Sequence, residues 1–137
     1  ASYRRQRQMC IRDRTKGEYI SPSTIEMKLS EDNNIEQVCI VGRGLTQPIA
    51  LITLSLQAEK LNKIELKEYF EISLNSFNKN LANYEKISQI VVLKTEWTVE
   101  NNFLTPSMKI KRNTIESAYS KRYPEWESSL EKVIFVD

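Results

Sequence analysis

Two apolar runs, residues 37–41 and 49–54, constrain the fold more than any other feature of the sequence. Both are rich in β-branched residues and only a short glycine-containing segment separates them, so we expect a β-hairpin that turns around residues 42–48. Neither run alternates cleanly between apolar and polar residues, which is typical of strands covered on both faces. A third run, residues 87–93, predicts another strand. The chain is therefore expected to form a small sheet between packed helices.

Helix signals flank these strands. Ser21 followed by Pro22 puts a proline at the first helical position, which predicts a short helix from Pro22 to about residue 31. Asn62 with Glu65 three residues later reads as a capping box that opens a long amphipathic helix. Its stripe at helical spacing, which we interpret as core, consists of Leu66, Tyr69, Phe70, Ser73, Leu74, Phe77 and Leu81.

The last third of the chain has weaker signals. Asn113 with Glu116 reads as another capping box, so we expect a helix over residues 113–122 that Pro124 ends. Residues 125–135 are expected to form a final short helix or an extended tail. The predicted fold class is α+β, with a small sheet of three or more strands, including a β-hairpin, packed by helices.

Composition fits one globular domain. The 137 residues are 40% hydrophobic and 28% charged, and no apolar stretch approaches the roughly 18 residues that a membrane span needs. The chain has no histidine, which excludes a histidine-based triad or a histidine-ligated metal within it. Cys10 and Cys39 are far apart in the sequence, so we expect neither a metal site nor a disulfide framework, and we expect a cytoplasmic location.

The first fourteen residues form a basic arm. Five arginines and one aspartate give the arm a net charge of +4, and the whole chain carries +2, so residues 15–137 carry −2. A nucleic-acid contact would depend on the arm alone, where Tyr3 is the only aromatic residue. We expect residues 1–14 to be disordered or foreign to the domain, and we expect no nucleic-acid partner.

One lysine stands on a stiff turn just before the helix predicted at residue 113. Pro106 fixes its own φ angle and biases Thr105 toward an extended conformation, so Lys109 lies on a short, rigid connection. A cation held in this way can be aimed at a phosphate or a carboxylate. The alternative is a solvated basic turn in which Lys109, Lys111 and Arg112 all contact water. From these residues alone both interpretations stay open.

Other familiar sites are absent from the sequence. It contains no G-x-x-x-x-G-K-[ST] phosphate loop, and the Gly-Arg-Gly at residues 42–44 lacks the third glycine of a dinucleotide-binding fingerprint, so we interpret it as the hairpin turn. The carboxylates form no recognisable acid–base pair. Glu26, Glu65 and Glu116 are interpreted as residues that favour helix starts.

The residue patterns of two segments resemble those of one known family. Residues 99–112, VENNFLTPSMKIKR, follow the pattern of an acidic-Asn-Gly turn, Leu-Thr-Pro-Thr, and a lysine between two apolar residues before Lys-Arg. Residues 16–26, KGEYISPSTIE, follow the pattern Gly-Lys-Tyr-Ile-x-Pro-x-x-Ile-Glu. Both patterns are typical of long-chain fatty acyl-CoA synthetases, which are AMP-forming members of the adenylate-forming superfamily. Asn102 replaces the family's glycine and also tolerates a left-handed conformation, whereas Glu18 replaces its usual lysine.

The resemblance implies that residues 15–137 are the C-terminal mobile domain of such an enzyme, without its large N-terminal domain. The implied enzyme activates a fatty acid with ATP to an acyl-adenylate and then transfers the acyl group to CoA. By motif position, Lys109 is the adenylation lysine, and Gly17, Glu18 and Tyr19 line the approach of CoA. ATP and Mg²⁺ would be bound mainly by the missing domain. The chain alone would then be inactive, and the full-length enzyme could associate peripherally with a membrane.

Three alternatives stay open at this point. The chain could be a stand-alone interaction module without catalysis, or a nucleic-acid binder that relies on residues 1–14. It could also belong to a luciferase-like or peptide-synthetase branch of the same superfamily, but those branches usually carry a Gly-Lys pair where this chain has Met108 and Lys109. The acyl chain length cannot be read from these residues, because the acyl tunnel of the resembled enzymes lies in the other domain.

Overall fold

A four-stranded mixed sheet forms the centre of the fold in a computed structural model, which describes residues 22–42, 47–81, 86–129 and 131–136. Strands β1 (Ile35–Val41) and β2 (Ile49–Leu54) pair antiparallel. Strands β3 (Gln89–Leu93) and β4 (Val133–Val136) continue the sheet in the order β1-β2-β3-β4, each parallel to its predecessor. The predicted hairpin pairing is confirmed, although residues 43–46 of its turn lie outside the described part of the chain.

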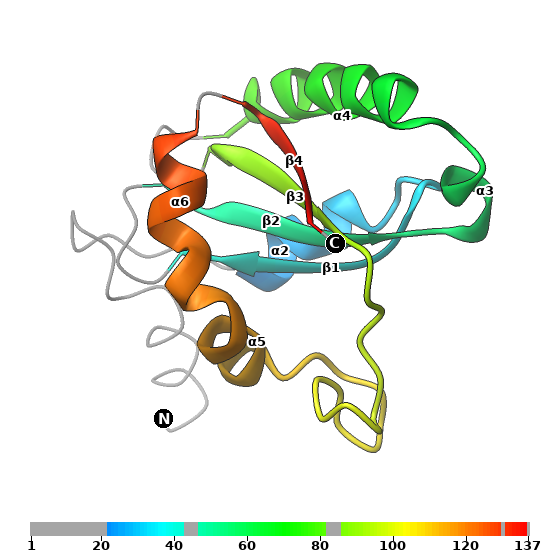
Figure 1. The fold of residues 1–137 in the computed structure, drawn as a ribbon, viewed down its shortest axis with the longest axis vertical. Helices are drawn as coiled ribbons and strands as arrows, with labels where there is room; N and C mark the ends of the chain where they lie inside the picture. Colours follow the sequence, from blue (N-terminus) through cyan, green and yellow to red (C-terminus); the bar gives the residue numbers. More distant parts are fainter. Residues whose placement is uncertain (1–21, 43–46, 82–85, 130, 137) are drawn as a thin grey trace.

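Helices cover both faces of this sheet (Figure 1). The first face carries α2 (Pro22–Leu29) and α4 (Lys63–Asn78), with the short α3 (Leu56–Glu59) before α4. The opposite face carries α5 (Arg112–Tyr119) and α6 (Tyr123–Ser128), joined by the 3₁₀ turn η2 (Ser120–Arg122). None of the helices in the described residues combines the length and apolar character needed to cross a membrane.

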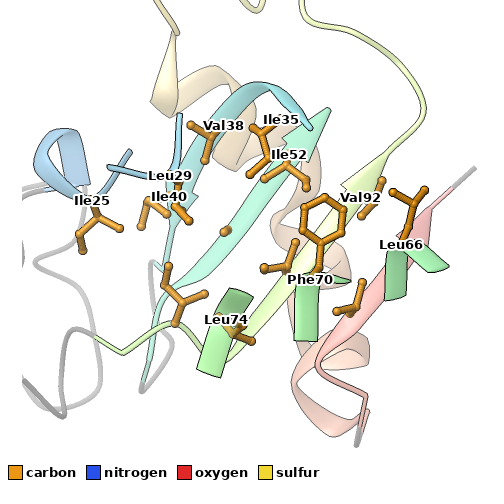
Figure 2. Close-up of a cluster of buried hydrophobic side chains, with 14 of the residues drawn as sticks. Ile25, Leu29, Ile35, Val38, Ile40, Ile52, Leu66, Phe70, Leu74 and Val92 are labelled. Carbon is orange, nitrogen blue, oxygen red and sulfur yellow. The ribbon is translucent and has the colours of Figure 1, made fainter. Parts of the chain in front are cut away.

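The two cores explain why the strands do not alternate in polarity. Along β1, Val38 and Ile40 belong to the core under α2 and α4, part of which is drawn in Figure 2, whereas Cys39 and Val41 belong to the core under α5 and α6. Successive side chains of a strand point to opposite faces, so both sets must be apolar when both faces are covered. The expectation that the strands are buried on two sides is confirmed.

The long helix begins where its sequence signal indicates. The side chain of Asn62 accepts a hydrogen bond from the backbone N–H of Glu65 at 2.8 Å, which caps α4. Phe70 at the middle of the predicted stripe is fully buried, but Tyr69 is 39% exposed and its hydroxyl donates to Asp32. The stripe is core at Leu66, Phe70 and Leu74, and Phe77 packs against them. Tyr69 lies at the polar margin, Ser73 is half-buried, and Leu81 follows the end of the helix at Asn78.

Two predictions about the helix after the lysine segment are wrong. Asn113 does not cap it, because α5 starts one residue earlier at Arg112. Lys111 occupies the cap position, and its side chain makes no capping hydrogen bond. Pro124 does not end the helical segment, because a new helix, α6, begins around it. Proline is tolerated in the first turn of a helix, where its missing N–H has no partner to lose.

The predicted ending, a short helix or an extended tail, is incomplete. After α6 the chain forms β4, in which Val133 pairs with Ile90 of β3. The buried side chain of Gln89 supports this connection, because its amide donates to the backbone carbonyls of Trp126 and Glu131. A parallel pair needs a long crossover connection, so no local pattern near residue 133 marks this strand.

Candidate functional site

The predicted lysine segment lies on the crossover between β3 and α5. In Figure 1 this part of the chain, in yellow, projects away from the sheet beside α5. Its base is a bridge between Leu104, which is buried, and Ile110, which is half-buried. Lys109 therefore stands near the tip of a loop whose two ends are anchored in the fold.

Thr105 closes the loop around Lys109. The Thr105 N–H donates to the carbonyl of Lys109 at 2.8 Å, and the Lys109 N–H donates to the Thr105 hydroxyl oxygen at 3.0 Å. A third bond runs from the Met108 N–H to the Thr105 carbonyl at 2.8 Å. Because one residue holds both backbone polar groups of Lys109, the direction in which its side chain leaves the loop is fixed.

Two residues of the segment have positive φ angles without being glycine. Asn102 has a φ of 71°, which confirms that asparagine adopts the left-handed conformation at the position where the resembled family has glycine. Met108 has a φ of 68°, which the sequence did not predict. Left-handed backbone is unfavourable for methionine. Met108 occupies the position of the glycine in the Gly-Lys pair that other branches of the superfamily usually carry. Glycine can adopt the left-handed conformation without strain.

A second turn supports the loop from the side of β3. The Asn101 side chain accepts a hydrogen bond from the Thr98 N–H at 2.9 Å and donates to the carbonyl of Glu96 at 2.8 Å. The Lys111 ammonium donates to the Asn102 side-chain oxygen at 2.7 Å, and so links the end of the loop to this turn. This bond argues against the sequence interpretation in which Lys111 is a freely solvated cation.

Arg112 makes a more distant connection. Its guanidinium contacts both carboxylate oxygens of Glu26 in α2, and the two side chains are only 16% and 13% exposed. Glu26 also accepts a hydrogen bond from the Ile40 N–H of β1 at 2.7 Å. Burial raises the pKa of Glu26 above its ordinary value of 4.5, although Arg112 and the Ile40 N–H act in the opposite direction.

These contacts correct the interpretation of the carboxylates. Glu26 lies in the middle of α2 and forms an ion pair rather than favouring a helix start. Glu116 is buried and accepts a hydrogen bond from the Tyr123 hydroxyl at 2.6 Å, so it too has a packing role. Glu65, in the first turn of α4, fits the original interpretation. A hint of the role of Glu26 was present in the sequence, because the resembled pattern itself ends in glutamate at that position.

The Lys109 side chain is exposed and differs from its neighbours in its contacts. Within the described residues its ammonium has no hydrogen bond or ion pair, whereas Lys111 and Arg112 are both engaged. A hollow of about 430 Å³ lies beside the loop, lined among others by Met27, Leu104 and Met108. The site thus presents one free cation on a hydrogen-bonded loop, beside a hollow that both apolar and polar residues line.

The remaining predicted site residues cannot be placed. Gly17, Glu18 and Tyr19 and the arm of residues 1–14 lie outside the described part of the chain. Among the residues that the structure describes, no group of three or more His, Cys, Asp or Glu side chains could hold a metal ion. This arrangement does not suit Mg²⁺, which prefers several oxygen ligands, so no chemical step is assigned to a metal held by these residues.

This fold and loop define a member of a known domain family. The family model of the AMP-binding enzyme C-terminal domain matches residues 14–125, and the chain belongs to that family. Its α+β sheet with helices on both faces is the fold of the C-terminal domain of adenylate-forming enzymes, as expected from the sequence.

Two relatives of the chain are long-chain-fatty-acid–CoA ligases of yeasts. The chain is 25% identical over 126 residues to long-chain-fatty-acid–CoA ligase 1 of Saccharomyces cerevisiae, covering 74% of this chain and 18% of that protein. It is 44% identical over 55 residues to long-chain-fatty-acid–CoA ligase 2 of Schizosaccharomyces pombe, covering 40% of this chain and 8% of that protein. The chain thus spans less than a fifth of the length of these relatives.

Solved structures share the fold at low sequence identity. The adenylation domain of a carboxylate reductase from Mycobacterium chelonae matches with a TM-score of 0.76 and 20% identity, over 88% of this chain and 20% of that one. The adenylation domain of a carboxylic acid reductase from Segniliparus rugosus, solved with AMP and a co-purified carboxylic acid, matches with a TM-score of 0.73 and 18% identity, over 89% and 20% of the two chains. At these identities the likeness concerns the fold.

Proposed function

We propose that this chain is the C-terminal domain of an AMP-forming long-chain fatty acid–CoA ligase, and that Lys109 acts in its adenylation step. Membership of the AMP-binding C-terminal family and similarity to two long-chain fatty acid–CoA ligases support the proposal. The single structural observation that carries it is the free Lys109 ammonium on a loop closed by Thr105.

The proposed reaction has two steps. A fatty acid carboxylate oxygen attacks the α-phosphorus of ATP, the bond to the β-phosphate oxygen breaks, and pyrophosphate leaves. The thiol sulfur of CoA then attacks the acyl carbon, the bond between that carbon and the phosphate oxygen breaks, and AMP leaves while the thiol proton is lost. Negative charge is concentrated around the α-phosphate in the first step, and a positioned ammonium can stabilise it there.

Lys109 suits the first step because its backbone is held while its side chain is free. A cation that is placed before the reaction stabilises developing charge without reorganising, whereas a mobile surface lysine must first be ordered. At about 4 Å and an effective dielectric near 20, an ammonium and a unit negative charge attract by roughly 4 kcal/mol. This interaction is large enough to matter to the rate.

Other parts of the proposal rest on the sequence resemblance. Gly17, Glu18 and Tyr19 would line the approach of CoA in the second step, where glycine lets the backbone come close to a ligand. ATP, Mg²⁺ and the fatty acid would be bound mainly by a preceding N-terminal domain. We also propose a cytoplasmic location, and residues 15–137 as the extent of the mobile domain.

The full-length protein that contains this domain provides the test. Incubated with palmitate, ATP, Mg²⁺ and CoA, it should release pyrophosphate and form palmitoyl-CoA, and the 137-residue chain alone should form neither product. A full-length protein that forms no acyl-CoA with any long-chain acid would contradict the proposal. Pyrophosphate release by the short chain alone would show that adenylation does not need the preceding domain.

A further inference from the structure

The ion pair between Glu26 and Arg112 joins two segments that are 86 positions apart in the sequence. Arg112 is the first residue of α5 and follows Lys109 by three residues. The carboxylate of Glu26 is held in turn by the backbone N–H of Ile40 in the sheet. Only two residues, Ile110 and Lys111, lie between the candidate lysine and Arg112, and each residue spans at most ~3.6 Å of chain.

This pair is not needed to attach either helix to the fold. Pro22, Ile25 and Leu29 are buried and already hold α2 against the sheet. Ile115 is fully buried and holds α5 against the opposite face. Both helices thus have apolar anchors of their own.

Stability is also a poor explanation for the pair. Removing two charges from water often costs more free energy than their attraction returns, and a well-packed apolar pair is frequently as stable. Burial raises the pKa of Glu26 in spite of Arg112, which indicates that keeping the carboxylate charged costs free energy in the folded chain. One nitrogen of the Arg112 guanidinium donates to both carboxylate oxygens of Glu26, and a charge-assisted contact of this kind fixes the relative position of the two side chains instead.

What the pair does fix is the end of the lysine loop. The beginning of the loop is held by the buried side chain of Leu104 and by the turn at Asn101. Residues 106–109 are exposed and make no such contact with the core. Without Arg112, the bridge between Leu104 and Ile110 and the bond from Lys111 to Asn102 would be left to hold the end of the loop.

We infer that Glu26 and Arg112 are positioning residues of the lysine loop, which hold Lys109 in place without touching a substrate. The inference rests on the proposed adenylation role of Lys109. A displacement of about 1 Å at a reacting group can lower a rate by about 10²-fold, so a contact that fixes the loop by this amount has a measurable effect.

The first test measures the loop directly in the 137-residue chain. Amide hydrogen exchange is compared between the parent chain and the variants Glu26→Gln, Glu26→Ala and Arg112→Lys. We expect the hydrogen-bonded amides of the loop to exchange about tenfold faster in these variants while the amides of β3 keep their protection. The loop amides to be followed are those of Thr105, Met108, Lys109 and Lys111.

A matched control is the exposed ion pair between Lys67 and Glu131, whose side chains are 39% and 58% exposed. Lys67→Ala should leave the exchange of the loop amides unchanged. If Glu26→Ala fails to fold, Glu26→Gln decides, because it keeps the size of the side chain and one acceptor oxygen. Unchanged loop protection in both Glu26→Gln and Arg112→Lys would overturn the inference, whatever the enzyme's activity.

The second test uses the full-length enzyme and a double-mutant cycle. Arg112→Lys should slow acyl-adenylate formation about tenfold or more, and adding it to Lys109→Ala should cause no further loss, because the pair acts through Lys109. Losses that multiply would show that Arg112 acts independently and would overturn the inference. If the parent enzyme forms no acyl-adenylate, the proposed function fails, and the exchange measurement alone decides whether the pair positions the loop.

Discussion

Replacing Lys109 by alanine in the full-length enzyme tests the proposed site most directly. The backbone of Lys109 is held by Thr105 and its side chain is exposed, so the substitution should leave the loop folded. The group that is removed is the ammonium proposed to stabilise the charge at the α-phosphate. Loss of a single preorganised group that stabilises developing charge lowers the rate by about 10² to 10³. We expect acyl-adenylate formation to fall by that factor.

The two half-reactions separate this role from a general defect. Adenylation is followed by pyrophosphate release with palmitate and ATP, and thioester formation by CoA consumption from supplied palmitoyl-adenylate. The second rate should change much less than the first, because the proposed contact of Lys109 is with the phosphate in the adenylation step. An unchanged adenylation rate in Lys109→Ala would show that this lysine has no role in that step.

Lys111→Ala is the internal control. Lys111 lies two residues away and carries the same charge, but its ammonium is bound to Asn102 at 2.7 Å rather than free. An exposed hydrogen bond of this kind contributes little, so we expect a loss of less than about tenfold, or about 1.4 kcal/mol. Similar losses from both substitutions would indicate a diffuse electrostatic effect of a basic patch, and the specific role of Lys109 would be refuted.

Three further predictions concern other parts of the chain. Gly17→Leu in the full-length enzyme should block CoA attack and largely spare adenylation, because Gly17 is proposed to line the approach of CoA, which takes part only in the second step. Equal losses in both half-reactions would point to misfolding of the segment instead. Met108 has a φ of 68° and is 66% exposed. In urea unfolding, Met108→Gly should stabilise the chain by up to about 1 kcal/mol, and Met108→Val should destabilise it by about 1 kcal/mol or more. The reverse order of stabilities would rule out backbone strain at this residue. Burial raises the pKa of Glu26 above 4.5, so the folded chain holds this proton more tightly than the unfolded chain. The stability of the parent relative to Glu26→Gln should therefore fall as the pH rises from 4.5 through the raised pKa. A stability difference that grows with pH would mean that Arg112 outweighs burial.

Much of the fold could be predicted because its signals are local. The Asn62 cap and the apolar spacing around Phe70 lie within one helix, and both describe α4 as it is found. The apolar runs of β1 and β2 do not alternate with polar residues, which indicates that both faces of the sheet are covered. By contrast, β4 is only four residues long and pairs with a strand that ends 40 positions earlier, so its partner cannot be read from neighbouring residues.

The candidate site likewise has some features that local sequence predicts and others that depend on distant contacts. Pro106 predicted a stiff connection at Lys109 from its own backbone preference and its effect on Thr105. Asn102 was expected to tolerate the left-handed conformation of the preceding turn. The roles of Arg112 and Glu26 depend on a contact between residues 86 positions apart. A single sequence does not show which distant residues come into contact in space. The left-handed Met108 could not be predicted, since nothing in a methionine side chain favours that conformation.

The contact between Glu26 and Ile40 also has a consequence for association between chains. Strand β1 is at one end of the sheet, so part of its backbone has no neighbouring strand to bond. Open strand edges can pair with other chains and start aggregation, and natural proteins often block them with charged groups. Because Glu26 occupies the outward N–H of Ile40, a variant without this carboxylate would expose a new place for a foreign strand to attach.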